Sequence, residues 1–389
     1  MSFDAQQLAK DAEQYQSLPG VHHAFCDRLL ASGLPIWRSS LGLEVLHPEM
    51  SGTQFRWIAS ETTVEVAQRG LRNMQRYEAS PVKIVDDTDK TYRRKLRAPI
   101  VDMPLLEELR QSGATDYVII PLAFLDRSRS AHISFATREP SGFSDEEIER
   151  LEEAARLFSP YAERLVLRRL AIDLLDVYLG HRSGERVFSG AIERGAVENI
   201  RAVICMGDLR GFTRFSDEQP ISSVIAALNE FFGVLVDAIS SEAGEVLKFM
   251  GDALLAIFPT VDGDLGPSSE AAMRALQRIG RGMEELNERR TAAGTRALGF
   301  GLALHAGEVA YGNIGGRTRL DFTVIGPAVN HTSRILELSK KINRPVLISG
   351  AFAERCAAPL VRLGKFRLRD VSRSHEVFVP QETIAPAAD

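Results

Sequence analysis

The apolar residues of this chain follow different periods in different regions, and these periods predict its elements. Between residues 144 and 179, apolar side chains recur every three or four positions, which predicts one long amphipathic helix. Ser144 and Glu147 form a capping box, which indicates that the helix begins there. Pro160 is expected to kink or break it midway, because proline lacks an amide hydrogen and crowds the preceding turn.

The region before this helix mixes helical and strand-like patterns. It predicts helices at 5–32, 62–77 and 103–111, and strands at 36–45, 53–59, 117–124 and 132–137. Strands that are followed by a closing helix resemble a GAF-type sensor domain. This resemblance implies that residues 1–143 form a GAF-like regulatory domain with an unknown small-molecule ligand.

The region after the long helix predicts a linker and a second α/β domain. Residues 180–200 are rich in glycine and charge, so residues 144–199 are interpreted as a connecting helix and linker. In residues 200–380 the predicted order is strand, helix, two strands around a turn, helix, strand and helix, with two strands at the end. This order favours a ferredoxin-like βαββαβ core, so the fold class is α/β (α+β).

Composition narrows the class of protein. A chain of 389 residues is long enough for two domains, and a net charge of -5 argues against a nucleic-acid partner held by phosphate contacts. No apolar run has the length of a membrane span, and the amino-terminal residues are polar. The three cysteines are widely spaced, as in a reducing compartment. We therefore expect a cytoplasmic protein without a membrane span.

Two acidic residues of the second domain are candidate metal ligands. Asp208 follows the strand at 202–206 and precedes a glycine-containing turn, where a carboxylate can hold a divalent cation. Asp252 stands in a Gly-Asp hairpin turn, with Lys248 on the strand before it, and can meet Asp208 across adjacent strands. Two carboxylates at one site repel each other unless metal ions neutralise them.

A third segment carries Asn330 and Arg334, which are four residues apart and share one helix face. Each of the three segments also has a simpler explanation: a turn-capping aspartate, an ordinary hairpin turn or a solvated helix face. Together, however, DLRGFT from Asp208, GEVLKFMGDALLAIF and DFTVIGPAVNHTSR resemble the class III nucleotidyl cyclases in order, spacing and identity. The resemblance covers residues 200–380.

The resemblance implies a two-metal site. Asp208, Leu209 and Asp252 would bind two Mg²⁺ or Mn²⁺ ions, one for the ribose 3′-hydroxyl and one for the triphosphate. Phe212 and Thr213 would contact the substrate. Phosphoryl transfer needs mostly positioning and charge neutralisation, which such a site supplies.

The resemblance also implies how the nucleotide is read. Asn330 would orient the ribose, and Arg334 would stabilise the charge that develops at the α-phosphate. Lys248 and Thr323 would read the base, because lysine can donate to an adenine ring nitrogen and threonine can accept from the amino group. Guanine-reading relatives carry an acidic residue in place of Lys248, so ATP is the expected substrate. The threonine, where many adenylate cyclases have aspartate, resembles a subgroup that includes bicarbonate-responsive cyclases.

One further contact of the family, a late basic residue that grips the terminal phosphates, has three candidates. These are Lys365, Arg369 and Arg373, of which we choose Arg369, although each also fits a solvated run of charge.

The sequence thus predicts a homodimeric adenylate cyclase that makes cyclic AMP and pyrophosphate from ATP, with its active sites at the dimer interface. Two alternatives remain open. One is a guanylate cyclase, which Lys248 disfavours. The other is a catalytically weak signalling or binding module with a cyclase-like domain, which the presence of all the candidate residues disfavours.

Overall fold

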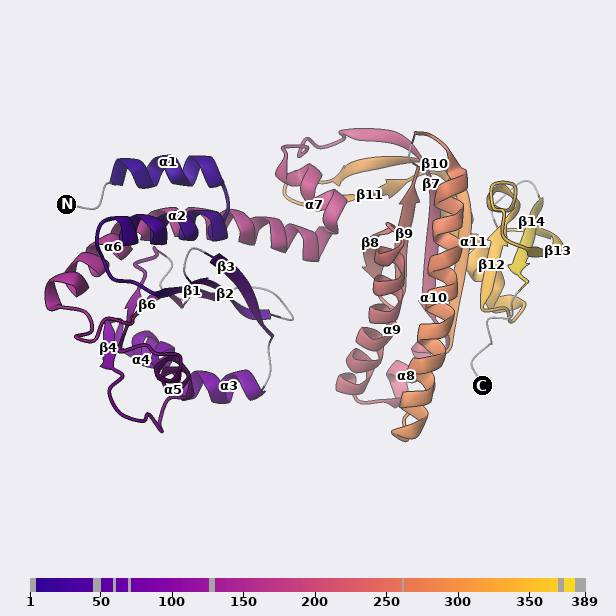
Figure 1. Cartoon of the computed structure of the whole chain (residues 1–389). Helices are drawn as coiled ribbons and strands as arrows, with labels where there is room; N and C mark the ends of the chain where they lie inside the picture. The colour runs from indigo at the N-terminus through magenta and orange to yellow at the C-terminus, as the bar shows by residue number, and fades with distance from the viewer. Residues whose placement is uncertain are drawn as a thin grey trace. The chain divides into compact units, whose positions relative to one another are not determined.

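The computed structural model describes residues 5–44, 50–58, 61–68, 71–125, 130–260, 262–369 and 374–381. The chain divides into two units, Met1–Leu174 and Leu175–Asp389, and each unit has its own sheet (Figure 1). The predicted three-part division at residues 1–143, 144–199 and 200–380 stays a prediction.

The first unit is an antiparallel sheet with helices on both faces. Its described strands follow the order β3-β2-β1-β6-β5-β4. They are β1 (Arg38–Glu44), β2 (Met50–Ile58), β3 (Glu61–Gln68), β4 (Tyr92–Lys95), β5 (Asp116–Pro121) and β6 (Ala131–Thr137). The helices of this part of the chain are α1 (Ala5–Tyr15), α2 (Leu18–Ala31), α3 (Leu71–Glu78), α4 (Pro81–Thr88), α5 (Pro104–Gln111) and α6 (Asp145–Leu179).

The two faces of this sheet differ, because successive side chains of a strand point to opposite sides. On one face, Leu41 and Phe135 pack with α2 and α6, where the rings of Phe25 and Phe158 stack with centroids 4.4 Å apart. On the other face, Tyr117 and its apolar neighbours pack with α4 and α5. The middle of the sheet is therefore covered on both sides, whereas the described side chains of β3 are mostly exposed.

Helix α6 begins as the sequence predicts. Ser144 Oγ accepts from the amide of Glu147 at 3.2 Å, and Glu147 Oε2 accepts from the amide of Ser144 at 2.7 Å, so the capping box is formed. Pro160 lies inside the helix without ending it. An interior proline costs about 3 kcal/mol, and the buried side chains of Leu151, Phe158 and Leu165 offset this cost by holding the helix against the sheet.

Two predictions for the first unit are wrong. The segment predicted as the start of a helix at 62–77 is instead strand β3, in which Thr62 and Val64 pair with β2, and a helix begins only at Leu71. The helix predicted at 5–32 is two helices. Gln16 adopts a left-handed conformation with φ 47°, and Ser17 caps α2 by accepting from the amide of Gly20.

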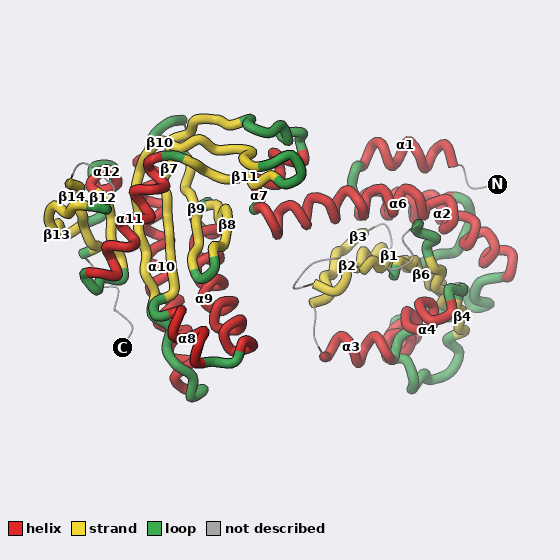
Figure 2. The backbone as a smooth tube through the Cα atoms, turned by 180° about the vertical axis from the view of Figure 1, so that it is seen from behind, coloured by secondary structure: helices red, strands yellow, loops and turns green. Residues whose placement is uncertain are grey.

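The second unit contains the predicted βαββαβ order. Its described strands follow the order β13-β14-β12-β10-β7-β9-β8, with β11 paired to β10. Helices α9 and α10 cover one face of this sheet and α11 the other (Figure 2). The strands are β7 (Val197–Leu209), β8 (Glu245–Met250), β9 (Ala253–Pro259), β10 (Phe300–Gly315), β11 (Leu320–Ile325), β12 (Val346–Ser349), β13 (Leu360–Arg367) and β14 (Ser374–Pro380). The helices are α7 (His181–Phe188), α8 (Phe212–Glu218), α9 (Ile221–Ser241), α10 (Leu265–Ala292), α11 (Pro327–Lys341) and α12 (Gly350–Ala353).

The predicted linker at 180–200 is not a loose segment, because it contains helix α7. The amide and the hydroxyl of Ser183 donate to Glu245 Oε1 at 2.8 and 2.6 Å, and the Tyr311 hydroxyl donates to Glu245 Oε2 at 2.9 Å. All three residues are buried. This hydrogen-bonded group fixes α7 to the sheet of the second unit.

Helix α9 has apolar residues on two sides. By length and composition alone, it is the one described helix that could cross a membrane. Phe231 and Leu235 are buried against the sheet, whereas Ile221 is 73% exposed and Ile225 is 51% exposed. The helix covers the sheet and leaves a second apolar face uncovered in the single chain.

Candidate functional site

Asp208 lies at the end of β7, with a neighbouring strand on each side. It pairs with Gly301 of β10 and with Ala253 of β9, and only 4% of its surface is exposed. A side chain at position 301 would meet two charged groups, because a Cβ there would lie 2.2 Å from Nη2 of Arg210 and 2.7 Å from Oδ1 of Asp208. Gly301 therefore leaves the space that the Arg210 guanidinium and the Asp208 carboxylate occupy.

Charged groups surround the carboxylate of Asp208. Lys340 Nζ lies 2.6 Å from Oδ2, and Arg210 Nη1 lies 3.7 Å from Oδ1. Burial raises the pKa of Asp208, Lys340 and Arg210 lower it, and the negative charge of Asp252 raises it. Oδ1 is buried and has no hydrogen-bond partner. An unpartnered carboxylate oxygen near a second carboxylate suits a cation.

Asp252 reaches this place from the turn between β8 and β9. Gly251 takes a left-handed conformation there, with φ 66°, and the amide of Leu209 donates to the carbonyl of Asp252 at 3.2 Å. The side chain of Leu209 is buried in the core, so only its backbone can act as a metal ligand. No group of three or more His, Cys, Asp and Glu side chains that could hold a metal occurs in the described residues. Two carboxylates therefore need further ligands, such as phosphate oxygens or water.

The turn after Asp208 leads into α8. Gly211 caps this helix in a left-handed conformation, with φ 66°. Phe212 packs partly against the core, whereas Thr213 is exposed. Both predicted substrate contacts thus follow directly after the predicted metal ligand.

A second group of candidate residues gathers on β8 and β11. Lys248 Nζ lies 2.5 Å from Oδ2 of Asp321, which was not among the predicted residues. Thr323 follows on the same face of β11, because residues two apart in a strand share a face. Its hydroxyl is buried and lacks a hydrogen-bond partner. The structure therefore places Lys248 in contact with Asp321, which lies two residues before Thr323 on the same face of β11.

Helix α11 carries the two candidates Asn330 and Arg334 on one side and Lys340 on another. Arg334 pairs with Glu337 at 2.6 Å, and Asn330 is exposed one turn earlier on the same face. Lys340 is six residues from Arg334, about 240° around the helix axis at roughly 100° per residue. Since Lys340 reaches Asp208 of its own chain, Arg334 and Asn330 point to a different side.

The family model of the adenylate and guanylate cyclase catalytic domain matches residues 197–356. These residues are a class III cyclase catalytic domain. The match includes Asp208, Lys248, Asp252, Asn330 and Arg334 and ends before Arg369. Class III cyclases typically use two metal ions, and the paired carboxylates at the end of β7 fit that use.

Known proteins resemble the cyclase domain and its surroundings. An adenylate cyclase of Anabaena cylindrica is 30% identical over 194 residues, which are 50% of this chain and 38% of that protein. An uncharacterised protein of Mycobacterium tuberculosis is 31% identical over 212 residues, which are 53% of this chain and 36% of that protein. The chain thus spans little more than a third of the length of these relatives.

A solved structure supports the fold over more of the chain. A bacterial light-regulated adenylyl cyclase covers 88% of this chain and 94% of its own, with a TM-score of 0.50 and 16% sequence identity. At that identity the likeness shows the fold alone: a mixed α/β chain with an antiparallel sheet in the first unit and a cyclase-fold sheet in the second. It does not identify the first unit as a GAF domain.

The late basic residues lie at the end of the cyclase unit. Lys365 is exposed on β13, and Arg369 is exposed in the turn that follows this strand. Arg373 lies outside the described residues. The choice of Arg369 stays a prediction.

Sequence reasoning missed three charged residues of the cyclase domain. Lys340 and Arg210 contact Asp208, and Asp321 contacts Lys248. A lysine in the last turn of a helix is ordinarily explained by its favourable interaction with the helix dipole. The sequence therefore does not indicate that Lys340 contacts Asp208. Asp321 gave a usable signal, since in a strand two residues apart share a face and Asp321 stands two residues before Thr323 in the segment DFTVIG.

Proposed function

We propose that this protein is an adenylate cyclase that converts ATP into 3′,5′-cyclic AMP and pyrophosphate. The observation that carries the proposal is the buried Asp208 carboxylate, with its unpartnered Oδ1 and the nearby charge of Asp252, inside a class III cyclase domain. The curated relative from Anabaena cylindrica is named an adenylate cyclase. Lys248 favours adenine over guanine, because lysine can donate a hydrogen bond to an adenine ring nitrogen.

The metal chemistry is proposed to rest on Asp208 and Asp252. Two Mg²⁺ or Mn²⁺ ions, when bound, supply charge neutralisation for the triphosphate and lower the pKa of the ribose 3′-hydroxyl. Asp208 and Asp252 hold the ions, with the backbone of Leu209 as a further ligand. Lys340 compensates the charge of Asp208 in the metal-free protein. Arg334 donates to the α-phosphate oxygens, and its planar fork fits them.

The base is proposed to bind between β8 and β11. Lys248 donates to a ring nitrogen of adenine, and Asp321 holds the lysine in place. The unpartnered hydroxyl of Thr323 accepts from the adenine amino group. A buried hydroxyl without a partner is costly, so a ligand that satisfies it gains affinity. Asn330 orients the ribose from α11.

The Lys248→Glu variant tests this assignment. We expect the kcat/KM for ATP to fall more than about tenfold, since one charged hydrogen bond contributes about 1.5–3 kcal/mol and 1.4 kcal/mol is a factor of ten. The ratio of GTP to ATP turnover should rise. Steady-state kinetics with each nucleotide measures both effects. Lys90→Glu, which changes an exposed lysine of the first unit, is the matched control. An unchanged preference for ATP in Lys248→Glu would mean that other residues read the base.

We further propose that the cyclase works as a homodimer with shared sites. The single chain leaves large apolar side chains exposed on neighbouring elements: Ile221 and Ile225 on α9 and Phe249 on β8. These elements touch, because the rings of Phe249 and of Phe232 on α9 lie 4.5 Å apart. Exposed apolar side chains that gather on touching elements are typical of an interface. One chain would then give Asp208 and Asp252, and its partner Lys248, Thr323, Asn330 and Arg334.

The first unit is proposed to regulate the cyclase through α6. Leu167 is 48% exposed and Val177 is 43% exposed in the single chain, so the apolar stripe of this helix is available to the same helix of a partner. The rival explanation, that the stripe packs on its own sheet, accounts for the earlier residues Leu151 and Phe158, which are fully buried. A cytoplasmic location is also proposed, on the wide spacing of the three cysteines in the sequence.

Changes to the first unit test the regulation. We expect deletion of residues 1–140 to change specific activity at least several-fold, because a small displacement at a shared site has a large effect on turnover. One residue inserted next to Gly180 rotates the helix by about 100° and should uncouple the units. Cyclase assays on dimers confirmed by light scattering measure both effects. Two variants that dimerise and turn over ATP like the intact chain would contradict regulation through α6.

A further inference from the structure

A buried arginine without an acceptor lies on the sheet of the first unit. Arg38 is on β1, on the face that packs with α5, and only 8% of its surface is exposed. In the described part of the chain its guanidinium is in no hydrogen bond or ion pair. Burial is the main cause that lowers the pKa of Arg38. Most of this side chain is buried and its charge has no partner among the described residues, so it must be solvated by water or by an anion from outside the chain.

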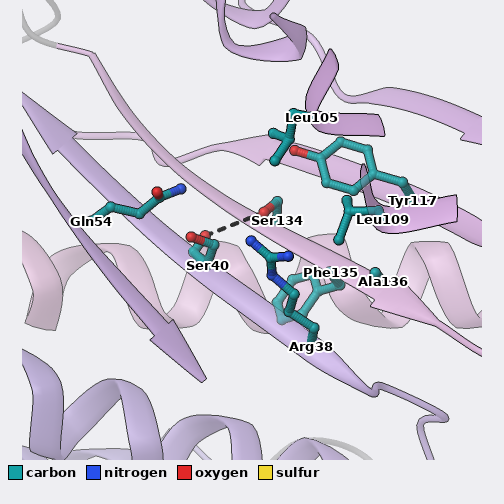
Figure 3. Close-up of a pocket in the computed structure, with 9 residues that line it drawn as sticks. All are labelled: Arg38, Ser40, Gln54, Leu105, Leu109, Tyr117, Ser134, Phe135 and Ala136. Atoms are coloured by element: carbon teal, nitrogen blue, oxygen red, sulfur yellow. Dashed lines mark hydrogen bonds between the residues drawn. The ribbon is translucent and has the colours of Figure 1, made fainter. Parts of the chain in front are cut away.

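The surroundings of Arg38 form a small polar cavity. Figure 3 shows its guanidinium pointing towards Ser40 and Ser134, with the Ser134 hydroxyl donating to the Ser40 carbonyl at 3.4 Å. Ser40 Oγ is buried and has no partner. The cavity measures about 10 Å³, about the room of one water molecule, and it is lined also by Gln54 and Tyr117. The cavity therefore contains the positive charge of Arg38 and the hydroxyl of Ser40, which has no hydrogen-bond partner.

The carboxylates nearest to Arg38 do not act as its counter-ion. Glu108 on α5 and Glu65 on β3 favour the charged form of Arg38 through space, but neither forms an ion pair with it among the described residues. Glu65 pairs instead with Arg56, Nη1 to Oε1 at 2.8 Å. Arg56 adds a second positive charge to the same face of the sheet, and its buried Nε has no partner. Two arginines and two glutamates thus balance in number, and what favours an anion is the guanidinium of Arg38, which forms no ion pair among the described residues.

We propose that this cavity binds one small monovalent anion, of the size and shape of formate or nitrate, between Arg38 and the hydroxyl of Ser40. The planar fork of arginine matches a planar oxyanion with two parallel hydrogen bonds. The apolar side chains of Leu105 and Leu109 on α5 line the cavity beside the charged groups. Formate and nitrate have three and four non-hydrogen atoms, more than the room of one water molecule, so their entry requires α5 to move away from the sheet.

The anion site has a direct route to the long helix within the first unit. Strands β1 and β6 carry Arg38 and Ser134 on one face, and on the other face Leu41 and Phe135, which pack in the same core as Phe158 of α6. An anion that orders these strands therefore also affects the apolar surface against which α6 packs. This regulatory consequence rests on the proposed cyclase function, whereas anion binding does not.

Equilibrium dialysis of the full-length chain with carbon-14-labelled formate tests the proposal. The buffer contains only large organic anions, and nitrate or chloride serves as the competitor. We expect one saturable site per chain with millimolar affinity, from which nitrate displaces formate better than chloride does. Arg38→Met should abolish this binding, and Arg94→Met, which changes a partly exposed arginine of the same unit, should keep it. Chloride competing as well as nitrate would contradict a planar oxyanion site.

Thermal unfolding gives a readout that a purely structural arginine would not produce. Without anion, Arg38→Met should be at least as stable as the natural chain, because the change removes an unpaired buried charge. Formate should raise the unfolding temperature of the natural chain and not that of the variant. Where Arg38→Met does not fold, Arg38→Lys keeps the charge but loses the fork, and we expect its affinity to fall about tenfold or more. Absence of saturable formate binding to the folded natural chain, or equal binding by Arg38→Met, overturns the proposal whether or not the chain makes cyclic AMP.

Discussion

Replacement of Asp208 by asparagine is expected to reduce cyclic AMP formation at least about a hundredfold, the scale of losing one group that stabilises transition-state charge. Asparagine keeps the shape of the side chain and removes the negative charge that two metal ions require. The carboxylate is 4% exposed and ends a central strand, so no neighbouring acidic side chain can take its position. Initial rates with Mg²⁺ and with Mn²⁺ measure the effect.

Two controls separate lost chemistry from lost folding. Glu288→Ala, which removes an exposed carboxylate of α10, should retain full activity. The circular dichroism spectrum and the dimer size of Asp208→Asn should match those of the natural chain, since Asp208 belongs to a site rather than to an apolar core cluster. A folded Asp208→Asn dimer that keeps more than a few per cent of its turnover would exclude the two-metal assignment.

A mixture of two inactive variants is expected to regain activity. In a shared site, Asp208 comes from one chain and Arg334 from the other, so a dimer of Asp208→Asn with Arg334→Ala has one intact site and one doubly altered site. Random exchange makes about half of the dimers mixed, and about a quarter of the natural activity should return. The two variants are mixed, a low concentration of denaturant dissociates their dimers, and removal of the denaturant lets the chains reassociate. Cyclic AMP formation is then measured.

The matched control for this experiment pairs two variants of the same half-site. Asp208→Asn mixed with Asp252→Asn should recover nothing, because every mixed dimer then has one altered metal ligand in each site. Recovery in the control as well, or no recovery with Arg334→Ala despite confirmed mixed dimers, would show that the sites are not divided between chains in this way.

Local signals in the sequence predicted much of the fold. The capping box at Ser144 and the Gly-Asp turn at Asp252 depend only on residues close in the chain, and the structure has both the start of α6 and the β8–β9 hairpin where they were predicted. The βαββαβ order after residue 200 was also predicted, because its longer strands and helices have a clear period. The predicted order lacks the short helices α8 and α12 and strand β11, and it has two strands after α11 where the structure has three. The family resemblance predicted a class III cyclase catalytic domain, and the match to residues 197–356 confirms this prediction.

Features that depend on distant residues were not predicted. The sequence of β3 is compatible with both a helix and a strand, and its pairing with β2 makes it a strand. Lys340 meets Asp208, 132 positions away, and Lys248 meets Asp321, 73 positions away. Ser183 in the expected linker is held by Glu245 of a later strand. Arg38 gave no sign in the sequence that it would be buried without an acceptor. The roles of the site residues themselves stay predictions.

The most direct test of the central proposal is the product that the purified chain makes from an equal mixture of ATP and GTP. The reaction contains Mg²⁺ or Mn²⁺, and mass spectrometry identifies the nucleotides while a coupled assay measures pyrophosphate. The expected result is 3′,5′-cyclic AMP with an equal amount of pyrophosphate and little cyclic GMP. Cyclic GMP as the main product would contradict the assignment of ATP through Lys248. A folded dimer that forms neither cyclic nucleotide would contradict the proposed activity itself.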